Sequence, residues 1–185
     1  MRRITDHVPV SNLITGRFKT GTDYTNWRPR GTRDWLLIAT TRGSGLYEAS
    51  DRRSFRSEAC ILTLYAPGVV QDYRTDTNAR RWDLVWAHFV PRPHWTPLLA
   101  WPEVLPGLMA MDMRSARAST DWLALVRELS AMDAVRHGGG SRSVDWSMNF
   151  LERALLIASR HVPDLSRSRQ DRRIESVKAR VADLA

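Results

Sequence analysis

Short apolar segments separated by turn-forming residues fill the first half of the chain. The strongest of these segments are 35–41, 60–65, 69–73 and 81–90. Gly43-Ser44-Gly45 follows the first of them, and we expect it to end that strand in a turn. Short strands bounded by turn signals and repeated about every ten residues are typical of a sandwich or a barrel.

The segment 81–90 also shows which side chains share a face. Successive side chains of a strand point to opposite faces of the sheet. This alternation places Trp82, Leu84, Trp86 and His88 together on one face. Large rings on the inner side of a barrel are therefore expected.

The pattern changes after Pro91. Five prolines lie within 91–106, so we expect no helix there longer than a turn or two. A helix capped by Ser119 or Thr120 then runs to Gly138. Its apolar positions recur at helical spacing: Trp122, Leu125, Val126, Leu129 and Met132.

A second helix is predicted from about 143 to 161. One apolar stripe contains Val144, Met148, Leu151, Leu155 and Ala158. Other faces are apolar as well, through Trp146, Phe150, Leu156 and Ile157. Either the helix is buried between the barrel and the first helix, or a second face packs against a partner subunit.

The last segment differs in composition from the rest. An arginine-rich stretch at 166–173 is typical of a linker. Near the end of this stretch, Asp171 is a candidate cap for a third helix that the chain does not complete. We expect the chain to be a truncated piece of a longer protein.

Composition indicates one ordinary globular domain. The 185 residues are 43% hydrophobic and 26% charged, which excludes a disordered chain. No apolar run approaches the roughly 20 residues that a membrane helix needs. The N-terminus lacks the apolar core of a secretory signal, so a cytoplasmic protein is expected. Cys60 is the only cysteine, which excludes an internal disulfide.

The net charge of +8 raises the question of nucleic-acid binding. The densest basic cluster lies in the linker-like stretch and has no apolar period. A solvated surface explains it better than a DNA-reading face, although direct DNA binding by this chain stays open as an alternative.

The candidate chemistry favours binding over catalysis. The five histidines show no spacing that would point two imidazoles at one metal, and no nucleophile elbow or phosphate loop is present. We predict no catalytic residue, no metal site and no cofactor. A guanidinium, a hydroxyl and an aromatic face suit a sugar, and Arg28, Tyr73 and Trp86 are candidates for these roles. The alternative is that Trp86 only fills the core.

A series of short motifs carries a resemblance to a known family. In order they are Arg28-Pro29-Arg30-Gly31, 36–45, Ala66-Pro67-Gly68 with Tyr73, Trp82, 86–95, Trp101-Pro102, 148–152, 155–156 and Asp171-Arg172-Arg173-Ile174. Their order and spacing resemble the sensing and dimerisation half of AraC-type (AraC/XylS family) transcription regulators. The resemblance covers about 25–185.

This resemblance implies a fold and a division of the chain. The fold class is mainly β, a cupin-like jelly-roll barrel followed by two α-helices that form a dimerisation element. An effector-binding and dimerisation domain would span 1–165. Its parts would be an N-terminal arm at 1–24, a barrel at 25–110 and helices at 119–161. The linker at 166–173 and the start of a truncated DNA-binding domain at 174–185 would follow.

The resemblance also implies functional residues. Family effector contacts fall on Arg28, Tyr73, Leu84 and Trp86. Leu84 stands where the parent arabinose-responsive regulator has a histidine, so a hydrogen bond to that sugar is lost.

The dimer-helix positions of the family fall on Trp146, Asn149 and Leu156, and an asparagine at such a seam would fix its register. The implied partners are a second copy of the chain and a small effector, expected to be a sugar. DNA would be bound only through helix-turn-helix units beyond the linker.

The function that follows is ligand sensing by a bacterial transcription regulator, without enzymatic activity. The alternative is an enzyme on the same barrel, a metal-dependent dioxygenase or isomerase. Cupin enzymes present two or three histidines and a carboxylate on adjacent strands, whereas here only His88 lies on a predicted strand.

Overall fold

A computed structural model describes residues 12–162. The described elements are β1 (Leu13–Thr20), β2 (Thr25–Arg28), β3 (Trp35–Glu48), β4 (Ser54–Glu58), β5 (Ile61–Tyr65), β6 (Gln71–Thr75), β7 (Trp82–Phe89), the 3-10 helix η1 (Pro93–Leu99), β8 (Glu103–Leu105), β9 (Leu108–Asp112), α1 (Ala116–Gly138) and α2 (Ser143–Ser159). The expected linker at 166–173 and the third helix lie outside the described residues.

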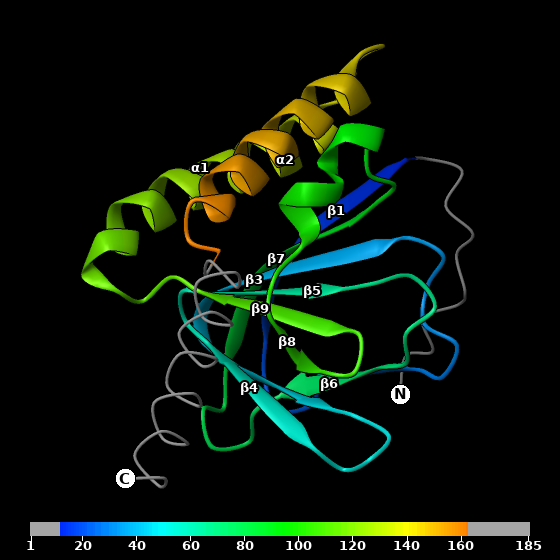
Figure 1. The fold of residues 1–185 in the computed structure, drawn as a ribbon, viewed down its shortest axis with the longest axis vertical. Coiled ribbons are helices and arrows are strands. Elements are labelled where there is room, and N and C mark those ends of the chain that lie inside the picture. Colours follow the sequence, from blue (N-terminus) through cyan, green and yellow to red (C-terminus); the bar gives the residue numbers. More distant parts are fainter. Residues whose placement is uncertain (1–11, 163–185) are drawn as a thin grey trace, which may run out of the picture.

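The strands form two antiparallel layers that share β3 (Figure 1). The larger layer has the order β1-β7-β3-β5-β9-β8, and in the smaller one β6 pairs with both β2 and β3, while β4 pairs with β3. The first part of β3 pairs with β5 and β7, and its last part pairs with β4 and β6. The predicted fold class, mainly β followed by two packed helices, is confirmed.

The expected turn at Gly43-Ser44-Gly45 is wrong, because β3 runs through it. Gly43 has φ +71°, and a Cβ there would lie 1.9 Å from the carbonyl oxygen of Arg81. The pairing with β7 also shifts register between Thr40 and Arg42. The glycines therefore let the strand bend from one layer into the other and pack closely against its neighbour.

The two faces of the larger layer carry different apolar clusters. In β7, Val85, Ala87 and Phe89 belong to the cluster shared with the helices. Trp82 and Leu84 belong to the second cluster, which lies between the layers, and Trp86 packs against it. The alternation predicted from the sequence is confirmed in this strand.

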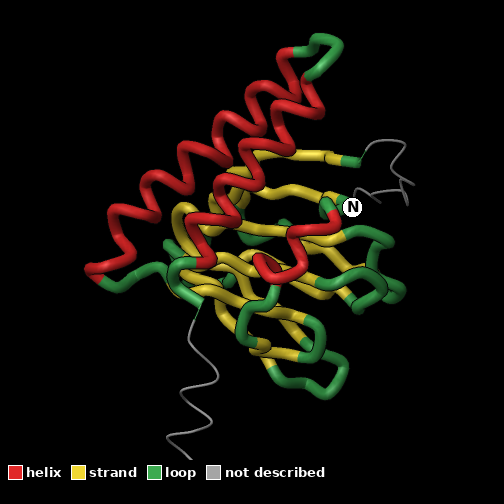
Figure 2. The backbone as a smooth tube through the Cα atoms, turned by 45° about the horizontal axis from the view of Figure 1, so that its top comes forward, coloured by secondary structure: helices red, strands yellow, loops and turns green. Residues whose placement is uncertain are grey.

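The helices lie as a hairpin over one face of the larger layer (Figure 2). The apolar positions predicted for α1 supply four buried residues, Trp122, Leu125, Leu129 and Met132. Those predicted for α2 supply Met148, Leu151, Leu155 and Ala158. Within 12–162, no helix has the length and apolar character that crossing a bilayer requires.

Three strands of the larger layer, β1, β8 and β9, carry little signal in the sequence. Residues 13–20, placed in the arm by the resemblance, form β1, which pairs along its whole length with β7. Its second half is largely exposed, because β1 is the edge of the layer, so its sequence carries little apolar signal. In the proline-rich region and just after it, β8 and β9 form a hairpin, and β9 pairs with β5.

Candidate functional site

Aromatic rings fill the inner side of the barrel beneath the predicted site. Tyr47 of β3, Tyr73 of β6 and Trp82 of β7 have ring centroids 5.6–6.0 Å apart. The Trp82 indole donates to Thr40 Oγ1 at 3.0 Å, so its polar atom is satisfied within the core. This cluster joins the two layers and forms a rigid base for the residues beside it.

The phenols around this base stay neutral. Burial raises the pKa of Tyr24, Tyr47 and Tyr65. For Tyr47, the hydroxyl is also hydrogen bonded to Thr63 Oγ1 at 2.9 Å. The rings therefore present apolar faces and hydroxyl groups, with no negative charge, to anything bound nearby.

Two of the predicted effector contacts meet directly. Arg28 of β2 donates from Nη1 to the Tyr73 hydroxyl at 3.3 Å and to Gln71 Oε1 at 2.8 Å. The pairing of β2 with β6 produces this arrangement, because Arg28 lies opposite Gln71 in the register. Gln71 is fully buried and was not predicted as a site residue.

The other two predicted contacts lie on β7. Leu84 is buried within the inner cluster and offers only an apolar surface. Trp86 is half-buried, and its ring lies 5.6 Å from that of Phe18. Phe18 in turn contacts Tyr24, and Tyr24 contacts Tyr73. Trp86 is thus linked to the Arg28–Tyr73 pair through a series of ring contacts.

The sequence did not point to a polar chain that extends from Gln71. Its amide Nε2 donates to Thr32 Oγ1 at 3.1 Å, and Thr32 donates to the Asp34 carbonyl at 3.2 Å. The Asp34 carboxylate is hydrogen bonded to His88 Nδ1 at 2.9 Å. Of these residues only His88 had a sequence signal, its place on the inward face of β7. The ring of His88 lies 5.7 Å from that of Trp86.

The Asp34–His88 pair is almost completely buried. Burial acts to raise the pKa of Asp34, but the hydrogen bond and charge of His88 outweigh it and hold this pKa below its usual value. Asp34 is therefore an ionised carboxylate at neutral pH, and it is already hydrogen bonded to His88.

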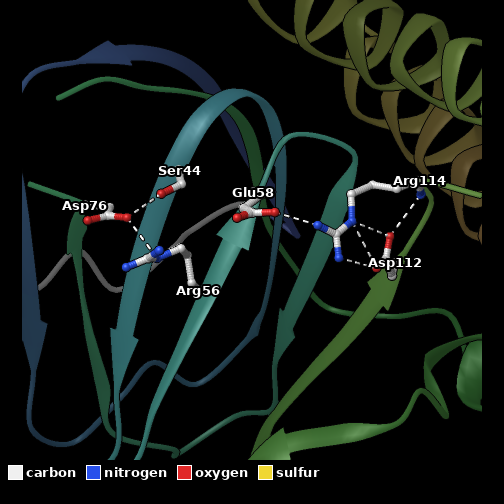
Figure 3. A network of polar contacts seen from close by, with 6 residues as sticks. All are labelled: Ser44, Arg56, Glu58, Asp76, Asp112 and Arg114. Carbon is white, nitrogen blue, oxygen red and sulfur yellow. Dashed lines mark hydrogen bonds and ion pairs between the residues drawn. The ribbon is translucent and has the colours of Figure 1, made fainter. Parts of the chain in front are cut away.

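Charged clusters beside β4 have a structural role (Figure 3). Asp76 Oδ2 accepts hydrogen bonds from Ser44 of β3 and from Arg56 of β4, each at 2.9 Å. Arg114, which follows β9, pairs with Glu58 of β4 and with an aspartate of β9. Each carboxylate faces an arginine, so these contacts tie β4 to neighbouring strands.

Histidine, cysteine and carboxylate side chains are the candidate metal ligands of residues 12–162. In that part of the chain no group of three or more His, Cys, Asp or Glu side chains is placed to hold a metal ion. The histidine nearest to the predicted site, His88, has a single carboxylate beside it, that of Asp34.

The predicted dimer positions lie together on the outer face of α2. Trp146 and Leu156 are 58% and 48% exposed, and Asn149 is exposed as well. The Asn149 Oδ1 atom accepts a hydrogen bond from Arg92 Nη2 at 2.8 Å. Their spacing of three and seven residues matches a coiled-coil seam.

Comparison with known proteins gives a likeness of fold. No family model matches the sequence, and no curated protein matches it. Among solved structures, apo ToxT from Vibrio cholerae aligns with a TM-score of 0.51 at 12% identity, over 76% of this chain and 53% of that one. The chain shares the fold of ToxT. ToxT is a regulator of the AraC family, and the chain spans about half of its length.

Further structures align more weakly. ToxT from the same organism with a bound unsaturated fatty acid has a TM-score of 0.47 at 12% identity, over 89% of this chain and 60% of that one. The iron(II) form of HppE with its substrate has a TM-score of 0.38 at 10% identity, over 42% and 46% of the two chains.

Proposed function

We propose that this chain is the effector-binding and dimerisation part of an AraC-type bacterial transcription regulator. The effector would be a small polar molecule, such as a sugar or a sugar acid, held inside the barrel. The whole protein would act in the cytoplasm and bind DNA through helix-turn-helix units beyond the linker. Support comes from the family motifs in the sequence and from the fold shared with ToxT.

One observation carries the proposal: Arg28 and Tyr73 meet at the inner side of the barrel. These are two of the positions at which the resemblance implies effector contacts. A guanidinium and a phenol offer hydrogen bonds to ligand oxygens, and the half-buried ring of Trp86 offers an apolar face for stacking. Leu84 contributes packing alone, so the effector differs from that of the parent regulator.

Dimerisation would use the exposed face of α2. Trp146 and Leu156 place large apolar side chains in solvent, while the opposite face of α2 is buried against α1 and the sheet. A second copy of this helix, packed antiparallel, would cover both residues. The contact of Asn149 with Arg92 would orient the polar position of this seam.

The proposal is tested by ligand-induced stabilisation. We expect at least one compound from a panel of pentoses, hexoses, sugar acids and an unsaturated fatty acid to raise the Tm, because a ligand that binds the native state stabilises it. Arg28→Ala and Trp86→Ala should abolish the rise. Trp27→Ala is the matched control, because Trp27 lies on β2 beside Arg28 but is 67% exposed on the other face.

Two results would count against this function. In the first, Trp27→Ala removes the rise in Tm as completely as Arg28→Ala does. The compound would then bind on the outer surface of the barrel. In the second, Arg28→Ala and Trp86→Ala unfold the protein, which means that both residues are structural.

A further inference from the structure

The inner surface of the barrel holds hydrogen-bond donors that no described residue satisfies. Asn26 Nδ2 and Trp86 Nε1 are both buried, and neither has a partner among residues 12–162. Arg28 uses Nη1 for its bonds to Gln71 and Tyr73. The Arg28 side chain is half-exposed, and it forms no ion pair with a carboxylate within the same described part of the chain.

These donors belong to one inner surface. In β2, Asn26 and Arg28 alternate with the exposed Thr25 and Trp27, so the first two share the inward face. Asn26 lies opposite Tyr73 in the strand register, beside the residue that Arg28 contacts. Trp86 packs against the inner cluster to which Tyr73 belongs.

Two acceptors of the polar chain already have partners. Gln71 Oε1 accepts from Arg28, and the Asp34 carboxylate is held by His88. The two buried atoms of this surface that lack a partner among residues 12–162, Asn26 Nδ2 and Trp86 Nε1, are both donors, and the half-exposed Arg28 beside them is a cation. The hydroxyls of a neutral sugar can accept these bonds, but they leave the charge of the guanidinium without a counter-charge. A carboxylate offers acceptors alone and can take two parallel N–H bonds from a guanidinium.

We propose that the effector of this barrel carries a carboxylate, which binds Arg28, and a ring that stacks on Trp86. This rests on the proposed effector-binding function and names the chemical class of its ligand. Asn26 and the Trp86 indole N–H supply further donors to ligand oxygens. A monoanion fits better than a phosphate dianion, because the polar chain offers no second unpaired cation: His88 is already paired with Asp34.

The test uses matched pairs of compounds that differ in charge. D-Galacturonate is compared with D-galactose, and benzoate with benzamide, on the full 185-residue chain at constant ionic strength. We expect the acid of at least one pair to raise the Tm and to bind about tenfold or more tightly than its neutral partner, measured by calorimetry.

Variants of the protein then test whether Arg28 is the residue that binds the carboxylate. Arg28→Gln should weaken binding of the acid about tenfold or more and leave binding of the neutral partner unchanged. Arg30→Gln is the control, because Arg30 is exposed two residues further along the chain. If Arg28→Gln does not fold, Arg28→Lys replaces it: the charge is kept but the parallel pair of bonds is lost, so binding of the acid should weaken without disappearing.

The outcomes separate this inference from the proposed function. Equal binding of an acid and its neutral partner, with both lost in Trp86→Ala, overturns the carboxylate and leaves effector binding intact. A loss in Arg30→Gln that equals the loss in Arg28→Gln overturns the assignment to Arg28. If no compound of either panel raises the Tm, both the carboxylate and the effector-binding function are rejected.

Discussion

Gly16 of β1 lies directly opposite Trp86 of β7, and the indole covers the glycine. A Cβ at position 16 would lie 2.6 Å from Cζ2 of the ring and 2.9 Å from Nε1. Real Cβ atoms do not approach ring atoms so closely. The position of the proposed stacking surface is therefore set by the absence of a side chain on the neighbouring strand.

Gly16→Ala tests this relationship. The added methyl group would force the indole to move, and we expect the free energy of unfolding in urea to fall by about 1–3 kcal/mol. In a Trp86→Leu background the same change should cost less, because the clashing ring is gone. Gly138→Ala is the control, since a Cβ there meets no atom within 4 Å. Equal costs of Gly16→Ala in the two backgrounds would contradict the predicted clash.

Local periodicity explains the part of the fold that the sequence predicted. The alternation in β7 predicted that Trp82 and Trp86 point inward. Helical spacing in α1 and α2 predicted which of their residues pack against the sheet. Both patterns depend on near neighbours in the chain, and burial imposes them directly. Arg28 and Tyr73 were reached through the family resemblance and the chemistry of their side chains, and the structure brings them together.

Non-local pairing explains what the sequence could not show. Asp34 and His88 are 54 positions apart, and their contact depends on the register between β3 and β7. Gln71 reaches Arg28 through the pairing of two short strands, again without a local pattern. The glycines at 43 and 45 led to the wrong prediction of a turn for another reason. A bend within a strand and a turn require the same residue type, and only the packing of the neighbouring strand decides between them.

The Asp34–His88 pair predicts a dependence of stability on pH. The pKa of Asp34 is lower in the folded than in the unfolded chain, so the folded state binds fewer protons at acid pH. Its contribution is therefore present above about pH 4 and is lost as the pH falls through the folded value. We expect Asp34→Asn to lower the free energy of unfolding by about 1–3 kcal/mol at pH 7 and by progressively less as the pH falls below about 4.

Urea unfolding at a series of pH values measures this difference. The same substitution at the exposed Asp23 is the control for a general effect of charge. A cost of Asp34→Asn that stays constant between pH 7 and pH 3 would show that the carboxylate charge does not contribute.

The hydroxyl pair of Tyr47 and Thr63 gives a prediction for the aromatic base. Both side chains are fully buried, and their oxygens lie 2.9 Å apart. Tyr47→Phe should cost about 1–2 kcal/mol in urea unfolding, because it leaves a buried threonine hydroxyl without its partner. Adding Thr63→Val should recover part of this loss, since no unsatisfied polar group then remains. A double variant as unstable as the sum of the single variants would contradict the pairing.

The exposed face of α2 gives a prediction about assembly. If Trp146 and Leu156 form the seam of a homodimer, Trp146→Ala should raise the dimer dissociation constant about tenfold or more, because large aromatic side chains dominate such interfaces. Leu156→Ala should act in the same direction with a smaller effect. Leu123→Ala is the matched control, because Leu123 of α1 is 61% exposed and was not assigned to the seam.

Sedimentation equilibrium over a range of protein concentrations measures these constants. The Tm of the unmodified chain should also rise with concentration, whereas that of Trp146→Ala should depend on concentration less. A chain that stays monomeric at high micromolar concentration would remove the dimer from the proposal. An equal effect of Leu123→Ala would place the interface on another face of the helical hairpin, because Leu123 and Trp146 belong to different helices.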